Sequence, residues 1–122
     1  MKAFTLLILL ALSGCATKQS LQVAIEGVYV RDFQNEFYIT SDTLVISGFN
    51  KEAGSYVIEE RTGSQPIRDG KIRPKQFHQT KEISHYDYKS AQLMGQRTGK
   101  IYSFPSSGTG LLRGTSPYRK IK

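Results

Sequence analysis

Residues 65–75 read Gln-Pro-Ile-Arg-Asp-Gly-Lys-Ile-Arg-Pro-Lys and hold the clearest local signal for the fold. A two-residue type I′ turn needs positive φ at both positions, which Asp69-Gly70 tolerates. The turn would place Ile67 opposite Ile72 in the two strands that flank it. The stretch therefore predicts an antiparallel β-hairpin.

Pro66 and Pro74 bracket this hairpin, and proline cannot donate a hydrogen bond to a central ladder. We therefore expect the hairpin to project from a sheet edge or a barrel rim. Short runs rich in Val, Ile, Tyr, Phe and Thr recur on both sides of it, separated by Gly, Asn, Asp, Ser and Pro. The predicted strands are Gly27–Arg31, Glu36–Thr40, Thr43–Ser47, Ser55–Arg61, Gln65–Arg68, Lys71–Arg73, Gln76–Tyr86, Gln92–Gln96, Lys100–Phe104, Leu111–Arg113 and Tyr118–Ile121.

This pattern is typical of an all-β protein, namely a small antiparallel meander. So many short strands must protect their edges by closing into a barrel or by folding into a sandwich, and we favour the barrel. The chain has 122 residues, which allows one domain of modest size. One Cys and two His exclude an intrachain disulfide and a zinc site with four Cys or His ligands.

The N-terminus has the layout of a secretory signal peptide. A short basic start precedes the apolar run Phe4–Ala11, and Leu12-Ser13-Gly14-Cys15 follows directly. This tetrapeptide resembles the lipobox of bacterial lipoproteins. The resemblance implies a signal peptide at residues 1–14, acylation of Cys15 and a lipidated tether at 15–25. The strand pattern then predicts a single β-barrel domain at 26–122. An ordinary signal peptide with a chance cysteine is the alternative.

Lipidation would fix the protein to a membrane, because two acyl chains already give stable anchoring. Ala16 follows the cysteine, at the position where some lipoproteins that are retained in the inner membrane carry Asp. By resemblance to known sorting patterns, we expect a cell-envelope location at the outer membrane, facing the periplasm.

Two further resemblances concern the mature chain. Gly27-Val28-Tyr29 is similar to the G-x-W signature of lipocalin-type barrels, in which a basic residue of the last strand covers the aromatic ring. This implies a lipocalin-like barrel, with Arg119 or Lys120 in that place. The block 56–71, together with 27–31 and 42–46, resembles small lipoproteins of conjugative elements, whose activity is undefined.

Signals for catalysis are weak. The sequence has no G-x-S-x-G nucleophile elbow. His78 and His85 are seven residues apart, so in one strand they point to opposite faces and cannot share a metal. Glu59 and Glu60 are adjacent and also point to opposite faces, so they do not form a carboxylate pair. We expect no enzyme, no catalytic residue, no metal and no cofactor.

Charge is unevenly distributed along the chain. Residues 16–60 carry three basic and seven acidic residues, whereas residues 61–122 carry thirteen basic and three acidic ones. The first interpretation is that the two halves interleave in one barrel and pair their charges in exposed ion pairs. The second is a cationic rim for an anionic partner, formed on the hairpin by Arg68, Lys71, Arg73 and Lys75.

The sequence thus predicts a lipid-anchored envelope protein that binds through a basic face, as a component or accessory of an envelope or conjugation assembly. The expected partner is an anionic envelope component or an acidic protein, besides the membrane reached by the anchor. An envelope location argues against nucleic acid. A carrier of small lipid-like ligands is the alternative, and a hydrolase is a more distant one.

Overall fold

A computed structural model of the chain describes residues 25–106 and 108–122. The predicted acylation site, Cys15, and the predicted signal peptide lie outside the described residues. The described part is all-β apart from one short 3-10 turn, η1(Lys51–Ala53). It contains no helix with the length and apolar character needed to cross a membrane.

Eight strands form a closed antiparallel barrel, and each pairs with the next one in the meander. The barrel strands are β1(Gly27–Gln34), β2(Tyr38–Asn50), β3(Ser55–Arg68), β5(Gln76–Asp87), β6(Gln92–Gly95), β7(Ile101–Ser103), β8(Gly110–Arg113) and β9(Ser116–Lys120). The two residues of β4(Lys71–Ile72) pair only with the end of β3. The last strand returns to the first, because Tyr29 and Val30 pair with Lys120 and Arg119. The predicted antiparallel barrel is confirmed.

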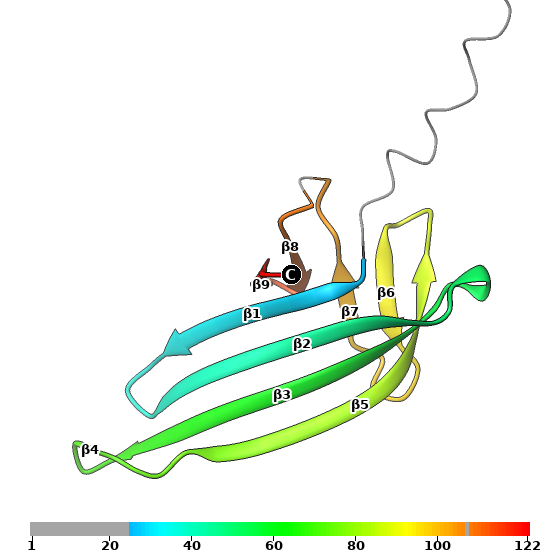
Figure 1. Cartoon of the computed structure of the whole chain (residues 1–122). Coiled ribbons are helices and arrows are strands. Elements are labelled where there is room, and N and C mark those ends of the chain that lie inside the picture. Colours follow the sequence, from blue (N-terminus) through cyan, green and yellow to red (C-terminus); the bar gives the residue numbers. More distant parts are fainter. Residues whose placement is uncertain (1–24, 107) are drawn as a thin grey trace, which may run out of the picture.

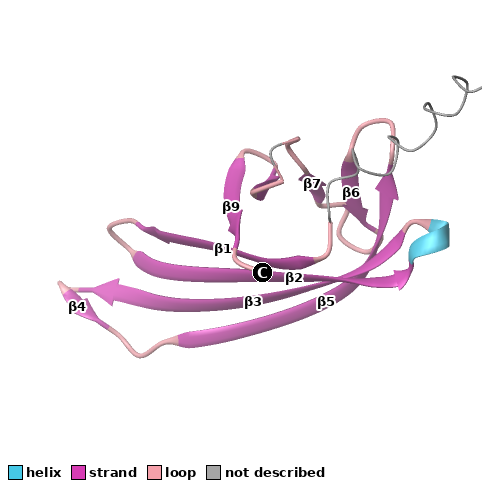
Figure 2. Cartoon of the chain, turned by 45° about the horizontal axis from the view of Figure 1, so that its top comes forward, coloured by secondary structure: helices cyan, strands magenta, loops and turns pink. Residues whose placement is uncertain are grey.

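The strands differ greatly in length, and this gives the molecule two ends (Figure 1). β1, β2, β3 and β5 run on as a long four-stranded sheet, whereas β6 to β9 are short and complete the barrel at one end only. Figure 2 shows these short strands arching over one end of the long sheet. We call this the closed end, and the four-stranded continuation is the projecting sheet.

The hydrophobic core lies inside the closed end. The most deeply buried hydrophobic side chains are Tyr29, Leu44, Ile46, Ile58, Leu93, Tyr102, Leu111 and Tyr118. Ile25 is also buried, and its carbonyl accepts a hydrogen bond of 2.7 Å from the Tyr29 hydroxyl. Because side chains alternate along each strand, these positions, together with Ser84 and Tyr86 of β5, define the inner face of the barrel strands, and their neighbours form the outer face.

Two predicted strand breaks are wrong. We expected the chain to turn around Ser41-Asp42, but β2 runs through both residues and pairs there with β1 and β3. We also expected a break between Arg61 and Gln65, where β3 is continuous. Turn-forming residues are tolerated in these strands because Asp42 is buried among hydrogen-bonding partners and Gly63 lies beneath a lysine side chain.

The lipocalin resemblance led us to expect a basic residue of the last strand over the first aromatic ring. Lys120 occupies this place, with its Nζ 5.7 Å from the centroid of the Tyr29 ring. Arg119 instead approaches Asp32, with 4.0 Å between Nη2 and Oδ2. The contact between the two ends of the chain therefore closes the barrel partly through a cation lying over an aromatic ring.

Candidate functional site

The predicted hairpin is present at the far tip of the projecting sheet (Figure 1). Asp69 has φ 53° and Gly70 has φ 72°, as a type I′ turn requires. Ile67 pairs with Ile72, as predicted. The returning chain is held to β3 by a hydrogen bond of 2.8 Å, donated by the Arg73 backbone N–H to the Pro66 carbonyl.

The structure brings three of the four predicted basic residues together. Arg68, Arg73 and Lys75 line a depression of about 410 Å³ beside the hairpin, together with Pro66, Pro74 and Gln76. Lys71 pairs with Arg68 across the hairpin and does not line the depression. None of the four predicted residues takes part in an ion pair within the part of the chain that the structure describes.

Lys75 does not extend outward with the hairpin but lies back over the outer face of the sheet. A Cβ atom added at Gly63 would collide with the Lys75 Cε, so the glycine leaves the space that the lysine stem occupies. The Lys75 Nζ also lies 5.7 Å from the centroid of the Phe77 ring. The absence of a side chain at Gly63 thus determines where this cation sits.

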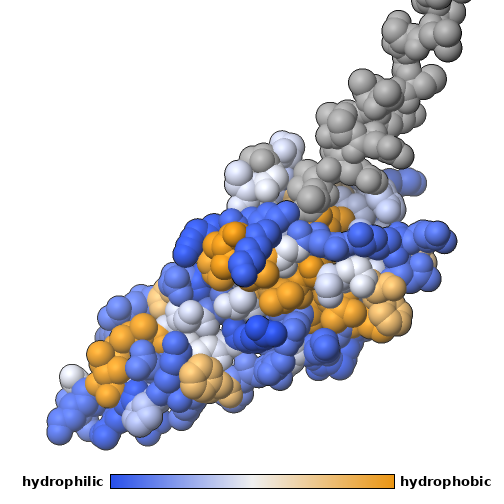
Figure 3. Space-filling model, in the orientation of Figure 1, coloured by the Kyte–Doolittle hydropathy of each residue, from blue (hydrophilic) through white to orange (hydrophobic). Residues whose placement is uncertain are grey.

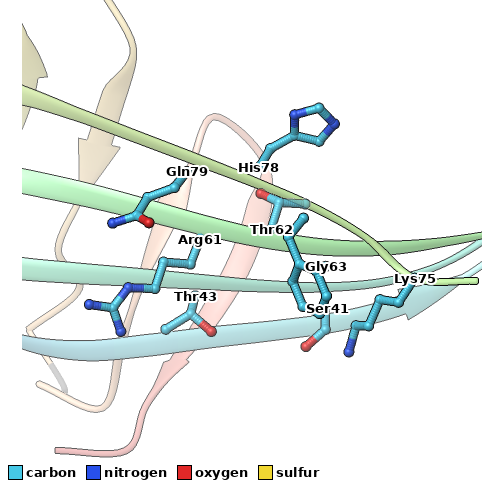
Figure 4. A pocket seen from close by; sticks show the side chains of 9 residues that line it. Ser41, Thr43, Arg61, Thr62, Gly63, Lys75, His78 and Gln79 are labelled. Carbon is cyan, nitrogen blue, oxygen red and sulfur yellow. The ribbon is translucent and has the colours of Figure 1, made fainter.

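A second depression, of about 420 Å³, opens where Lys75 crosses the sheet. Its lining on the outer face consists of Ser41, Thr43, Arg61, Gly63, Lys75, Phe77 and Gln79, contributed by β2, β3, β5 and the segment before β5. In Figure 4 the side chains of Ser41, Thr43, Arg61, Lys75 and Gln79 point to one side of the sheet, whereas Thr62 and His78 point to the other. We call this depression, with its two cations, the basic cradle.

Arg61 is oriented within the basic cradle by Glu59, which faces the same side of β3. The Arg61 Nε and Nη2 atoms each donate a hydrogen bond of 3.2 Å to the Glu59 carboxylate, and the Gln79 amide donates another. The Arg61 guanidinium, acting against a small desolvation effect, lowers the pKa of Glu59. Glu59 therefore stays ionised and offsets part of the charge of Arg61, whereas Lys75 has no carboxylate partner in the described part of the chain.

The chemistry of the basic cradle suits an anionic group. Two hydroxyls and an amide can donate hydrogen bonds, and a guanidinium and an ammonium supply positive charge at opposite sides. Sequence reasoning found Lys75 but missed Arg61, Ser41, Thr43 and Gln79. An isolated glycine inside a strand indicates close approach of another group, so Gly63 was the available signal.

The sequence also gave no indication of a buried polar cluster at the inner mouth of the closed end. Asp42 accepts hydrogen bonds from the Tyr118 hydroxyl and from the Thr62 hydroxyl at 3.0 Å. Arg113 bridges two carboxylates, with its Nη2 3.2 Å from Asp42 and its Nη1 paired with Glu60. As the sequence predicts, Glu60 and Glu59 do not form a carboxylate pair. Glu60 instead shares Arg113 with Asp42 of the neighbouring strand β2.

The two carboxyl groups of this cluster differ in their affinity for protons. Burial, reinforced by the neighbouring Glu60, raises the pKa of Asp42. Burial also acts to raise the pKa of Glu60, but Arg113, Asp42 and Lys100 outweigh it, so this pKa is lowered. Burial and the bond to Asp42 raise the pKa of Tyr118. Every member of the cluster has a hydrogen-bond or ion-pair partner within it. A buried polar network that is satisfied in this way stabilises a unique packing of the strands.

The first interpretation drawn from the sequence, that charges of the two halves pair, holds for four cations of the basic half. Arg61, Lys100, Arg113 and Arg119 from the basic half pair with acidic residues at positions 32, 42, 59 and 60. The cations of the hairpin do not pair in this way. The tip of the projecting sheet therefore carries four cations of the basic half that have no ion-pair partner among the described residues.

His78 lies on the inner face and His85 on the outer face of β5, so the two do not approach one another. No group of three His, Cys, Asp or Glu residues among the described ones could hold a metal ion. In comparisons with family models, curated proteins and solved structures, no family model, protein or structure matches this chain.

Proposed function

We propose that this chain is a lipid-anchored cell-envelope protein that captures an anionic partner through the basic cradle and the adjoining hairpin. The observation that carries the proposal is the position of Lys75, which lines both depressions. Arg68 and Arg73 extend the positive charge to the tip, and Arg61 extends it along the sheet. The protein would act as a component or accessory of an envelope or conjugation assembly, at the outer membrane facing the periplasm.

The geometry suits an anchored binding protein. The described chain begins at Ile25, whose side chain is in the core of the closed end. The hairpin lies about ten residues further along β3 than Ile58, which is roughly 33 Å in an extended strand. A tether leaving from the closed end would thus hold the basic tip away from its point of attachment.

The lipid anchor itself is tested by metabolic labelling with a fatty-acid analogue. We expect label on the wild-type chain and none on Cys15→Ala, because the Cys15 thiol would carry the diacylglyceryl group. Equal labelling of both proteins would disprove acylation at this residue.

The binding role is tested by reversing the charge of the four hairpin residues to Glu: Arg68, Lys71, Arg73 and Lys75. Rim charges act mainly on the association rate and are screened beyond about 8 Å at physiological ionic strength. We therefore expect wild type to bind anionic envelope components in a salt-dependent way and the fourfold variant to lose binding without loss of its β-sheet circular dichroism.

A matched control reverses four exposed cations elsewhere, namely Lys51, Lys89, Arg97 and Lys122. It changes the net charge by the same amount and leaves the hairpin intact. Equal loss in both variants would attribute binding to net charge alone, and no loss in the hairpin variant would refute the proposed site.

Carriage of a small lipid-like ligand in a lipocalin-like barrel is the second candidate. The packing of Lys120 over Tyr29 favours it, since the lipocalin resemblance implies that contact. The interior of the closed end is however filled by side chains such as Tyr102, Leu93 and Leu111. Retention of a fluorescent fatty acid by the purified chain would move this candidate ahead.

A further inference from the structure

The projecting sheet has an unpaired edge along the first half of β5 (Figure 1). β6 pairs with β5 only from Ser84 to Asp87. Upstream of that contact, every residue from Gln76 to Lys81 is exposed. Unpaired edges are ready templates for another strand.

The hydrogen-bonding groups of this edge alternate in direction. The Tyr86 N–H bonds toward β3, to the Gly54 carbonyl, whereas the Ile83 carbonyl accepts from the Gln96 N–H on the opposite side. Because the direction alternates along an antiparallel strand, the odd-numbered residues of β5 turn their N–H and C=O groups away from β3. The outward groups are those of Phe77, Gln79 and Lys81, all beyond the reach of β6.

The same three residues carry their side chains on the outer face, beside the basic cradle. Phe77 is 76% exposed and Gln79 lines the cradle. Lys81 is exposed and pairs in register with Glu59. Arg61, Lys75 and Lys81 outnumber Glu59, the one acidic residue beside them on this face of the described sheet, so the edge has a net positive surround.

The opposite edge of the projecting sheet, formed by β1, is a poorer template for an added strand. β9 covers β1 as far as Val30, which leaves only Arg31 to Gln34 unpaired. That edge carries Asp32, a carboxylate that would repel an acidic strand, and Arg119 approaches it. Length and charge both favour the β5 edge.

We propose that the edge of β5 from Gln76 to Lys81 binds an extended acidic segment of a partner protein, which adds to the sheet as an antiparallel strand. This deepens the proposed function and rests on it, since the basic cradle supplies the charge that selects the guest. Main-chain hydrogen bonds to Phe77, Gln79 and Lys81 hold the segment, and side chains on alternate positions give specificity.

The register determines which guest residues matter. A guest residue directly opposite Gln79 directs its N–H and C=O toward β5, because Gln79 directs its own groups outward. Its side chain lies on the outer face, between Phe77 and Lys81 and next to the basic cradle. We expect the guest to carry Asp or Glu opposite Phe77, Gln79 and Lys81. The guest residues between these positions have their side chains on the inner face, beside His78 and Thr80.

The test uses a synthetic peptide in which Glu alternates with Thr, and the full-length chain. N-methylation of every Glu removes the donors that face β5, whereas N-methylation of every Thr removes donors that face solvent. We expect the first modification to weaken binding about tenfold or more and the second to leave it nearly unchanged. If the peptide shifted its register by one residue, its Glu side chains would lie on the inner face, away from the basic cradle. The charges therefore oppose a shift that would let the N-methylated peptide bind through its other N–H groups.

A variant of the protein makes the reciprocal test. Gln79→Pro removes one outward N–H and leaves the backbone hydrogen bonds to β3 in place, whereas Gln79→Ala keeps the N–H; both variants lose the side-chain bond to Glu59 of β3. We expect the proline variant to bind the unmodified peptide clearly more weakly than the alanine variant, because both lack the Gln79 side chain and only the proline variant lacks the N–H. If that variant does not fold, the pair of methylated peptides decides alone.

The outcomes separate this inference from the proposed function. Equal binding of both methylated peptides would overturn strand addition. If the fourfold charge reversal weakens peptide binding but the backbone modifications do not, the basic face binds anions without the edge. Binding to phosphatidylglycerol vesicles with no binding to the peptide would identify a lipid headgroup as the occupant and would also overturn the inference.

Discussion

The closed end and the projecting sheet are made from the same four long strands but face different surroundings. In the closed end the inner face of these strands is covered by β6 to β9, and Tyr29, Leu44 and Ile46 are almost completely buried. In the projecting sheet no other strand of the described chain covers the inner face, and Phe37 in the turn before β2 and Phe77 in β5 are 61% and 76% exposed. Figure 3 shows a mostly hydrophilic surface there, interrupted by separate hydrophobic patches.

This difference in burial suggests that the closed end determines the stability of the fold and that the projecting sheet is accessible to partners. Burial of apolar area stabilises the closed end, whereas the projecting sheet depends on its hydrogen-bonded ladders and on continuity with the core. A surface that is exposed on both faces and along an edge is available for partners. We therefore expect mutations of the closed end to have the larger effects on stability, and mutations of surface side chains on the projecting sheet to change binding.

The largest effect should come from Arg113, at the boundary between the two regions. Arg113→Ala removes the cation that bridges Asp42 and Glu60. Asp42 then has no cationic partner in the described chain, whereas Lys100 stays beside Glu60, and removing one partner of a buried ion pair costs about 3 to 5 kcal/mol. Urea unfolding measures this loss. The control is Arg119→Ala, since its exposed pair with Asp32 should be worth about 0 to 1 kcal/mol. Equal losses in the two variants would remove the distinction between the regions.

An intermediate effect is expected at the tip of the projecting sheet. Gly70 has φ 72° and an added Cβ would meet nothing within 4 Å, so only backbone strain opposes a side chain. Gly70→Val should cost about 1 to 2 kcal/mol, while Gly70→Asn should cost less because asparagine tolerates this conformation. The melting temperature measures both. An unchanged value for the valine variant would indicate that the tip opens independently of the closed end.

The same contrast separates what could be predicted from the sequence from what could not. The hairpin was predictable because Asp69-Gly70 and the flanking isoleucines form a local pattern. The cluster around Asp42 was not, since Arg113 and Tyr118 lie more than 50 residues away in the chain from their acidic partners. Ser41-Asp42 has the composition of a turn, and only these distant partners explain why it lies inside a strand.

The basic site was predictable in part for the same reason. Arg68, Lys71, Arg73 and Lys75 are close in sequence, so their shared location followed from the hairpin. Arg61 joins Lys75 only because Gly63 lets the lysine lie across the sheet, which is a tertiary contact. Composition revealed the excess of positive charge, but the register between strands decides which cations are neutralised.

The smallest effect concerns Glu82, where β5 enters the closed end. Burial acts to raise the pKa of this carboxyl, but hydrogen bonds from the Thr98 hydroxyl and from the backbone N–H groups of Thr98 and Arg97 lower it overall. A lowered pKa means that the folded state binds the proton less tightly than the unfolded chain does. Glu82 therefore contributes stability above the unfolded value of about 4.3, and the contribution is lost as the pH falls through the folded pKa.

Glu82→Gln tests this dependence, because glutamine does not titrate. We expect the variant to be less stable than wild type above about pH 5 and the difference to shrink as the pH falls below about 4. Urea unfolding over a pH series measures the difference, and the other carboxyl groups titrate in both proteins and largely cancel. If the difference in unfolding free energy between Glu82→Gln and wild type does not change with pH, the ionised carboxylate does not stabilise the packing of the turn between β6 and β7 on the closed end. The projecting sheet would then be the place to look for the acid sensitivity of the fold, through Glu59 and its bond to Arg61.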